Sequence, residues 1–149
     1  KDWSFKLSNG LSQTALLGLV KVNQESPSSQ NAITNTIFRN HLDGRAFCND
    51  PDVFFLRDIN IGYNWEQKLL HGKVNSICGN VLFVSDNAGD FDDNRIDVLK
   101  DFFKDKAYKV NMAEFVDEDV IRLDFTEDGV EKSLTMNLIT GESNVFDVL

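Results

Sequence analysis

Apolar positions in the first two-thirds of the chain recur every three or four residues in three segments, with short apolar runs between them. This spacing predicts helices over residues 30–42, 65–78 and 92–104, each with one apolar face. The runs at residues 46–49 and 81–84 are too short to be helices and predict strands. Because residues 81–84 are all apolar, we expect that strand to be buried on both faces.

Residues that favour helix ends flank these segments. Ser28 or Ser29 precedes the first helix and Asn64 precedes the second, and all three residues are good N-caps. Gly44 and Gly79 follow the C-terminal ends of the same two helices, where glycine is common. Spacing and end residues therefore agree on the order helix, strand, helix, strand, helix.

The hydrophobic period changes after Lys106. Apolar residues then alternate with polar ones in three stretches, with the turn sequences "VDED", "TEDG" and "ITGES" after them. A period of two is typical of strands, so residues 107–149 predict an antiparallel meander, and we divide the chain into residues 1–106 and 107–149. The N-terminal part has a weaker pattern, which predicts a short strand at residues 4–7 and a helix at residues 15–22.

Size and charge narrow the classes of function. The 149 residues are 42% hydrophobic, which is enough for one core in the usual single-domain range. The formal net charge of −9 argues against binding nucleic acid, which needs a basic surface, and against anionic membranes. No apolar run approaches the roughly 20 residues that cross a bilayer. The N-terminal "KDWSFKLSNG" lacks the apolar segment of a signal peptide, and its start in mid-pattern suggests part of a longer chain.

Cysteine and histidine usage gives no sign of a metal site. Cys48 and Cys78 do not form a CxxC pair, and we expect both to be buried free thiols in a reducing compartment, which indicates a cytoplasmic protein. His41 and His71 fall on predicted helices without the spacing of a zinc site, and we expect them to be surface or capping residues. The chain also lacks a Gly-rich phosphate loop and a Ser-His-Asp set, so we expect no metal and no cofactor.

Two strand-like segments run directly into acidic loops. "AFCN" is followed by Asp50, Pro51 and Asp52, and "VLFV" is followed by Ser85 and Asp86. In parallel α/β structures ligands bind beyond the carboxyl ends of the strands, so we expect Asp50, Asp52 and Asp86 to line one acidic pocket. Pro51 has a fixed φ and keeps Asp50 extended, which holds the neighbouring carboxylates in place.

A structural role is the alternative for both loops. Asp-Pro-Asp is also a common turn, and "SDNAGDFDDN" fits a solvated loop in which Asp90 or Asp92 caps the next helix. This loop does not match a calcium-binding EF-hand, because counting from Asp90 the sixth position, which should be glycine, is Arg95.

The segment "NAITNTIFRNHLDGRAFCNDPDVFFLRDINI", followed by a helix and "GNVLFVSDN", resembles the late catalytic barrel of glycoside hydrolase family 36, the melibiase-type α-galactosidases, and looks closest to bacterial members. The elements that carry the resemblance are Arg39, Gly44-Arg45, Asn49-Asp50-Pro51-Asp52, Leu56-Arg57, Glu66-Gln67 and Ser85-Asp86. They lie within residues 28–103, about half of the chain. The β-rich part after Lys106 is similar to the β-domain that follows the barrel in such enzymes.

The resemblance implies an α/β fold: the last βα units of a (β/α)₈ barrel, followed by an antiparallel β-sheet region. It also implies retaining hydrolysis of α-linked galactosides. Asp52 is the residue that the resemblance places against the sugar, whereas Asp50 is expected to hold the corner in shape. The catalytic residues are unassigned. The family nucleophile lies on an earlier strand, and this chain has Lys6 and Gly10 where the family acid/base pattern is Arg-x-x-x-Asp.

Three hypotheses follow for the function. The first is a part of an α-galactosidase-like enzyme that acts on an α-galactoside, with the nucleophile supplied by the remainder of a larger chain. The second is a non-catalytic carbohydrate-binding or interaction module that has lost the catalytic acid. The third is a compact α/β domain in which only the fold is shared. Two barrel units cannot close a barrel, so we also expect a homo-oligomer or a longer chain.

Overall fold

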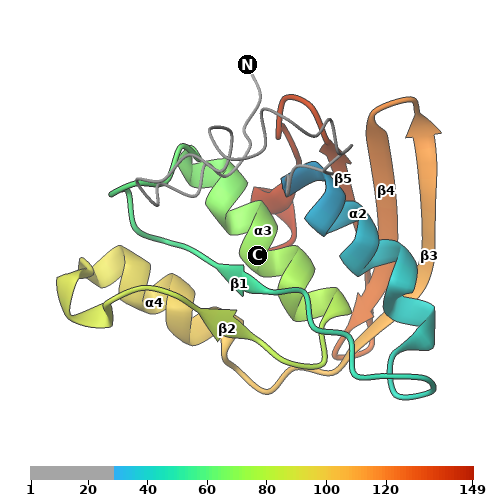
Figure 1. Ribbon diagram of the computed structural model, residues 1–149. Coiled ribbons are helices and arrows are strands. Elements are labelled where there is room, and N and C mark those ends of the chain that lie inside the picture. Colours follow the sequence, from blue (N-terminus) through green and yellow to red (C-terminus); the bar gives the residue numbers. More distant parts are fainter. Residues whose placement is uncertain (1–28) are drawn as a thin grey trace, which may run out of the picture.

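The computed structural model describes residues 29–149, which form a mixed helix and strand structure with two separate small sheets (Figure 1). The strand and helix expected at residues 4–7 and 15–22, and the expected cap Ser28, lie outside the described residues. The described elements are α2 (Ser29–Arg39), η1 (Asn40–Leu42), β1 (Val53–Phe54), α3 (Trp65–Cys78), β2 (Phe83–Val84), η2 (Ala88–Asp90), α4 (Asp93–Phe102), β3 (Tyr108–Asp117), β4 (Val120–Glu127), β5 (Val130–Asn137) and η3 (Val145–Asp147). No helix within residues 29–149 has both the length and the apolar character needed to span a membrane.

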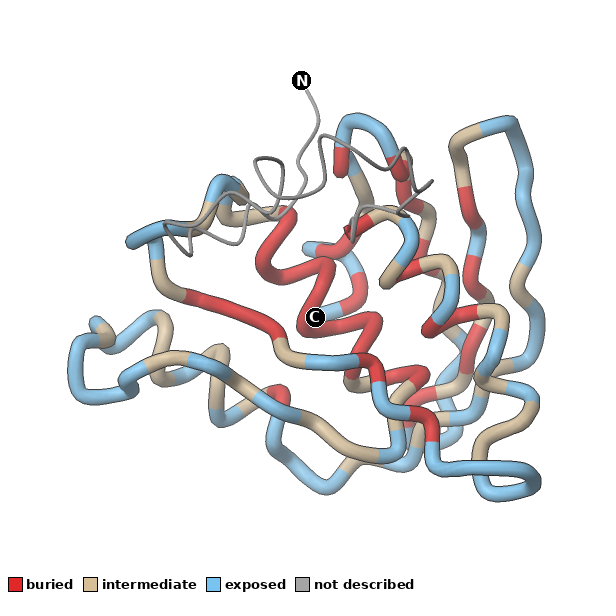
Figure 2. The backbone as a smooth tube through the Cα atoms, in the orientation of Figure 1, coloured by how far each residue is buried: buried red, intermediate tan, exposed pale blue. Residues whose placement is uncertain are grey.

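Helix α3 is the central element of the structure. It packs against α2, β1, α4, β3 and η3, and eleven of its fourteen residues are buried. Figure 2 shows the result as an almost continuous buried segment through the middle of the molecule. A helix that is covered on most of its circumference cannot be simply amphipathic, because polar residues must then also lie inside. The buried residues of α3 accordingly include Lys68, Lys73 and Asn75.

The predicted ends of α3 are confirmed. The Asn64 side chain accepts a hydrogen bond from the Gln67 backbone N–H at 2.9 Å, and the Gln67 side chain accepts one from the Asn64 N–H at 2.9 Å. This reciprocal pair is a capping box, which satisfies two backbone donors at the helix start. Gly79 ends the helix as predicted, and its N–H donates to the Asn75 carbonyl.

Strands β1 and β2 pair in parallel and lie on either side of α3 in the sequence, so β1, α3 and β2 form a βαβ unit. The strand predicted at residues 46–49 is wrong, because the strand begins only at Val53, after the Asp-Pro-Asp corner. The Asn49 side chain instead donates to the Thr36 and Cys78 carbonyls, and so ties this segment to two helices rather than to a sheet.

The expectation that residues 81–84 form a strand buried on both faces is also wrong. Strand β2 spans only Phe83–Val84, and the Phe83 side chain is 51% exposed. Only β1 pairs with β2 among the described residues, so a single strand neighbour covers it. An apolar run shows that a strand can be buried, but the number of neighbouring strands decides whether it is.

The predicted antiparallel meander is confirmed as the sheet β3-β4-β5. One face of this sheet enters the core through Ile121, Leu123, Phe125, Leu134 and Met136. The alternation predicted for β3 breaks at a register shift between Val110 and Met112, so Ala113 takes the core side and Met112 is exposed. The core is continuous across Ala107, because one cluster joins α2, α3 and α4 to β4 and β5.

A buried charge cluster links α3 to the meander. Glu127 of β4 accepts hydrogen bonds from Lys73 of α3 at 3.1 Å and from Tyr108 of β3 at 3.0 Å. Lys106 and Lys132 also form ion pairs with this carboxylate. Burial by itself would raise the pKa of Glu127, but the hydrogen bonds from the three ammonium groups outweigh it and lower that pKa to about 2. The pKa of Lys73 is lowered by its burial, which its contact with Glu127 only partly offsets.

We expect the stability of the protein to fall in acid through Glu127. Its pKa is about 4.3 in an unfolded chain and about 2 in the folded one, so its contribution is complete above about pH 4.5 and is lost as the pH falls toward 2. Glu127→Gln should lower the free energy of unfolding at pH 7 by about 3 kcal/mol, because Lys73 remains buried without a charged partner.

Urea unfolding followed by circular dichroism between pH 7 and pH 2 measures this effect. The difference between wild type and Glu127→Gln should shrink as the pH falls below about 4.5. Parallel stability curves for the two proteins over that range would contradict the assigned role of Glu127.

Candidate functional site

The acidic corner that precedes β1 is held in one conformation. The Asp50 carboxylate accepts a hydrogen bond from the Asp52 backbone N–H at 3.0 Å, and the Asp52 carboxylate accepts one from the Val53 N–H at 2.8 Å. The Asn75 side chain of α3 donates to the Asp52 carbonyl at 3.2 Å. Asp50 therefore holds the backbone of the corner, and both carboxylates are exposed.

Asp52 has a strained backbone. Its φ is 68°, a left-handed conformation that costs a residue with a side chain roughly 1 kcal/mol. Such strain persists only where the surroundings hold it, and it is concentrated at functional sites. The corner packs against the end of α3, where the Pro51 ring lies directly against Gly79. The contact is so close that a Cβ added at Gly79 would lie 2.8 Å from the Pro51 ring. The Asp52 side chain is thereby presented to solvent on a rigid support.

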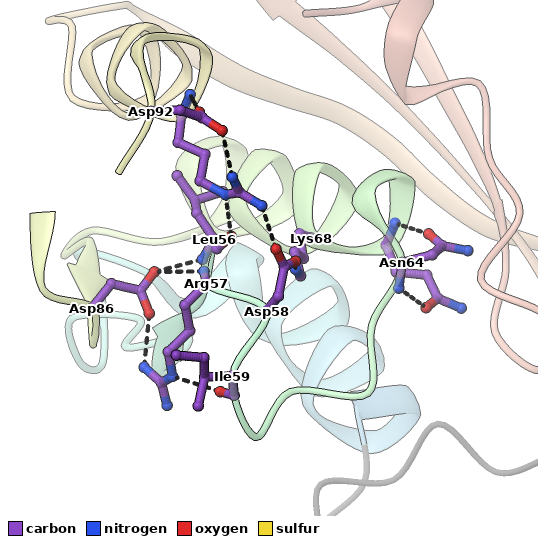
Figure 3. A network of polar contacts seen from close by, with 10 residues as sticks. Leu56, Arg57, Asp58, Ile59, Asn64, Lys68, Asp86 and Asp92 are labelled. Carbon is purple, nitrogen blue, oxygen red and sulfur yellow. Dashed lines mark hydrogen bonds and ion pairs between the residues drawn. The ribbon is translucent and has the colours of Figure 1, made fainter. Parts of the chain in front are cut away.

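Asp86 has a different environment from Asp52. Its side chain is 1% exposed and forms an ion pair with Arg57 at 2.7 Å (Figure 3). It also accepts hydrogen bonds from the backbone N–H groups of Leu56 at 2.5 Å and Arg57 at 3.3 Å. These contacts fasten the segment after β1 to the segment after β2. Asp86 thus joins the carboxyl ends of the two parallel strands and has no exposed carboxylate for a ligand.

The expectation that Asp52 and Asp86 share one pocket is wrong. Strands β1 and β2 run parallel, with Val53 beside Phe83 and Phe54 beside Val84. Asp52 precedes β1 and therefore lies at the amino end of the pair, whereas Asp86 follows β2 at the carboxyl end. The error has a simple cause. The strand forms after the Asp-Pro-Asp corner and not before it.

Sequence reasoning missed a network of charges at the carboxyl end of the parallel pair. The Asp58 carboxylate pairs with Lys68 of α3 and with Arg95 of α4, as Figure 3 shows in part. The hydrogen bond from Lys68 is the main cause of a lowered pKa of Asp58, and the charge of Arg95 adds to it. Arg95 also donates to the Leu56 carbonyl at 3.0 Å and pairs with Asp92.

This network serves the packing of α3 and α4 more than it serves a ligand. Lys68 has a side chain that is almost completely buried, and its ammonium group needs the Asp58 carboxylate. The available signal was weak. Lys68 falls opposite the apolar face of a predicted helix, where a lysine is expected to face solvent, and nothing in the sequence connects it to Asp58, which follows a strand.

A groove of about 790 Å³ lies elsewhere, between the α2–η1 segment and β3. Its lining includes the cationic residues Arg45, Lys106 and Lys109 together with Phe38 and Tyr108. None of the three predicted site residues lines this groove. It is therefore a feature separate from the acidic corner.

Within residues 29–149 there is no group of three or more His, Cys, Asp or Glu side chains that could hold a metal ion. His71 is buried, contrary to the surface or capping role expected for it, and burial lowers its pKa to about 4 against the effect of the Asp52 charge. Cys78 is buried as expected, and burial raises the pKa of its thiol to about 12. Cys48 is exposed, so the prediction that both thiols are buried is wrong.

The geometry therefore leaves Asp52 as the predicted site residue whose carboxylate is exposed on a backbone held by other elements, through Asn75 and Pro51. It can accept hydrogen bonds from hydroxyl or other donors, and a charged acceptor makes stronger bonds than a neutral one. No protein-family model matches this chain, and no curated protein matches it.

We expect Asp86→Ala to destabilise the protein without changing the acidic corner. It removes a buried ion pair and leaves the N–H groups of Leu56 and Arg57 without their acceptor, so the free energy of unfolding should fall by about 2–4 kcal/mol. Asp97→Ala on α4 is the matched control. Its exposed pair with Lys100 should contribute less than about 1 kcal/mol. Equal losses for both variants in urea unfolding would show that Asp86 does not fasten the strands.

Proposed function

We propose that this chain is part of a retaining, α-galactosidase-like glycoside hydrolase, in which Asp52 binds the sugar. The observation that carries the proposal is the Asp52 carboxylate, exposed on a strained and braced backbone within the "NDPD" motif. A hexose presents a ring of hydroxyl donors, so its site needs acceptors in fixed positions. Asp50 acts as the brace, and Asp86 holds the strands together rather than contacting the substrate.

The βαβ unit supports the proposed architecture. A (β/α)₈ barrel repeats a strand, a helix and a parallel strand, and β1, α3 and β2 have that order and pairing. Asp52 lies at the amino end of β1, whereas barrel active sites lie at the carboxyl ends, so the proposed sugar contact departs from the usual barrel site. The two-stranded sheet leaves Phe83 half exposed, which fits a surface that further strands of a longer chain would cover. The proposal includes this longer chain, which would also supply the nucleophile and the catalytic acid.

The chemistry assigned to this segment is binding rather than bond cleavage. Retaining hydrolysis needs two carboxyl groups about 5–5.5 Å apart, one as nucleophile and one as acid/base. One oxygen of Asp52 accepts the Val53 N–H, and the other has no partner among residues 29–149. That oxygen would accept a sugar hydroxyl, with no metal or cofactor involved. We also propose a cytoplasmic location, because Cys48 and Cys78 are both free thiols.

A non-catalytic carbohydrate-binding module is the second candidate. The burial of Asp86 favours it, because only one of the two acidic loops then offers a carboxylate to a ligand. Under this proposal the chain binds a galactoside through Asp52 and cleaves nothing.

Binding of galactose to the 149-residue chain tests both candidates. Isothermal titration should show binding, and Asp52→Asn should weaken it about 10- to 100-fold, because a charge-assisted hydrogen bond contributes about 1.5–3 kcal/mol. Asp105→Asn is the matched control, since Asp105 is also exposed but lies outside the corner. Equal affinity of wild type and Asp52→Asn would exclude Asp52 from the site. Absence of galactose binding would overturn both candidates.

Hydrolysis of an aryl α-galactoside by the longer chain that the first candidate requires separates the two candidates. Turnover that Asp52→Asn reduces and Asp105→Asn does not would support an enzyme. Galactose binding by the longer chain without turnover would support the binding module.

The strain at Asp52 makes a further prediction about stability. Asp52→Gly should be about 1 kcal/mol more stable than Asp52→Ala, because glycine adopts a φ of 68° without a steric cost. Both variants should lose galactose binding, since neither has a carboxylate. Thermal unfolding and isothermal titration of the two variants measure the two effects separately. Higher stability of Asp52→Ala would mean that the corner relaxes, and that its strain has no part in the site.

A further inference from the structure

Strand β3 has one edge that no other strand of the described residues pairs with. Within residues 29–149 it pairs with β4 on one side only, and it is the longest strand of the meander at ten residues. Figure 1 shows it at the outer margin of the molecule. The free side of such a strand presents backbone donors and acceptors that another strand can pair with.

The side chains near this edge are unusually apolar for a surface. Met112, Phe115 and Val116 are 42%, 49% and 50% exposed. Edge strands that avoid association usually carry inward-pointing charges or proline, and the stretch from Met112 to Val116 has no proline and only one charge, Glu114. The groove of about 790 Å³ runs beside the same edge, with Tyr108 and Val110 in its lining.

Charge is distributed unequally along β3. Lys109 stands near its start, and Glu114 and Asp117 stand toward its end. Two copies of β3 paired in parallel would place like charges together, whereas antiparallel pairing places the start of one strand against the end of the other. The charge pattern therefore favours a symmetric antiparallel pair, although the whole chain carries a net charge of −9.

We propose that two copies of this chain associate through β3, antiparallel, in a register that places Lys109 opposite Glu114 of the second copy. Cross-strand neighbours must lie on the same face of a sheet, and this register meets that condition. Lys109 and Glu114 both lie on the face away from the core. The same register places Val110 opposite Ala113 and Tyr108 opposite Phe115, and all four lie on the core face, beside buried residues of β4 or its Glu127.

The groove gives the register an independent support. Phe115 of the second copy lies next to Tyr108, which lines the groove, so this half-exposed ring covers part of the groove beside it. The twofold axis repeats the contact in the other direction. Two three-stranded sheets become one sheet of six strands. This inference does not rest on the proposed glycosidase function, because the edge lies outside the acidic corner.

Charge reversal tests the register with the 149-residue chain. Sedimentation velocity of the wild type should show a dimer whose population rises with concentration. Lys109→Glu and Glu114→Lys should each raise the dissociation constant at least tenfold, because each places two pairs of like charges across the axis. An equimolar mixture of the two single variants should restore association, since positions 109 and 114 then carry opposite charges at both contacts of a mixed dimer.

Two controls keep the result specific. Lys100→Glu changes an exposed residue on α4 and should leave the dissociation constant unchanged. Glu114 also lies beside Arg122 of β4, so the thermal unfolding midpoint of Glu114→Lys is measured to separate a folding defect from lost association. A monomeric wild type, a dimer that neither reversal weakens, or a mixture that associates no better than the single variants would each overturn the proposal.

Discussion

The burial of α3 on nearly all sides is the constraint on which the rest of the structure depends. A helix in this position brings lysine side chains inside, and a buried ammonium group is tolerated only with a carboxylate close by. Lys68 forms an ion pair with Asp58 in the segment after β1, and Lys73 forms one with Glu127 at the end of β4. One helix therefore fixes the positions of two segments that are distant from each other in the sequence, and it joins the parallel pair to the meander.

The acidic corner depends on the same helix. Asn75 of α3 donates to the Asp52 carbonyl, and Gly79 at the end of α3 makes room for Pro51. Because these contacts hold the backbone, the corner maintains a left-handed residue with an exposed carboxylate. The positive φ alone does not distinguish Asp52, because Asp128 in the turn between β4 and β5 is also exposed and left-handed. The contacts that Asn75 and Gly79 make with the corner are what distinguish it.

Two acidic loops that look alike in the sequence serve different purposes. Asp52 lies at the amino end of β1 and faces solvent. Asp86 lies at the carboxyl end of β2, where its carboxylate pairs with Arg57 and accepts hydrogen bonds from two backbone N–H groups. In the proposed glycosidase role, Asp52 is therefore the one predicted site residue that contacts the sugar. The proposed association through β3 uses a different kind of surface, an apolar edge with a lysine near its start and two acidic residues toward its end, and so leaves the acidic corner free.

Features that depend on residues close together in the chain could be predicted from the sequence. The three described helices, the capping box of Asn64 and Gln67, the glycine end of α3 and the alternation of β4 and β5 all follow from local spacing and capping. Tertiary structure decided what depends on distant partners. Asn49 binds the ends of two helices instead of joining a sheet, so β1 begins after Asp52, and a shift in register turns Met112 outward. The ion-pair partners of Asp86, Lys68 and Glu127 likewise depend on which oppositely charged residues the packed elements bring close. Spacing along the chain does not predict those partners.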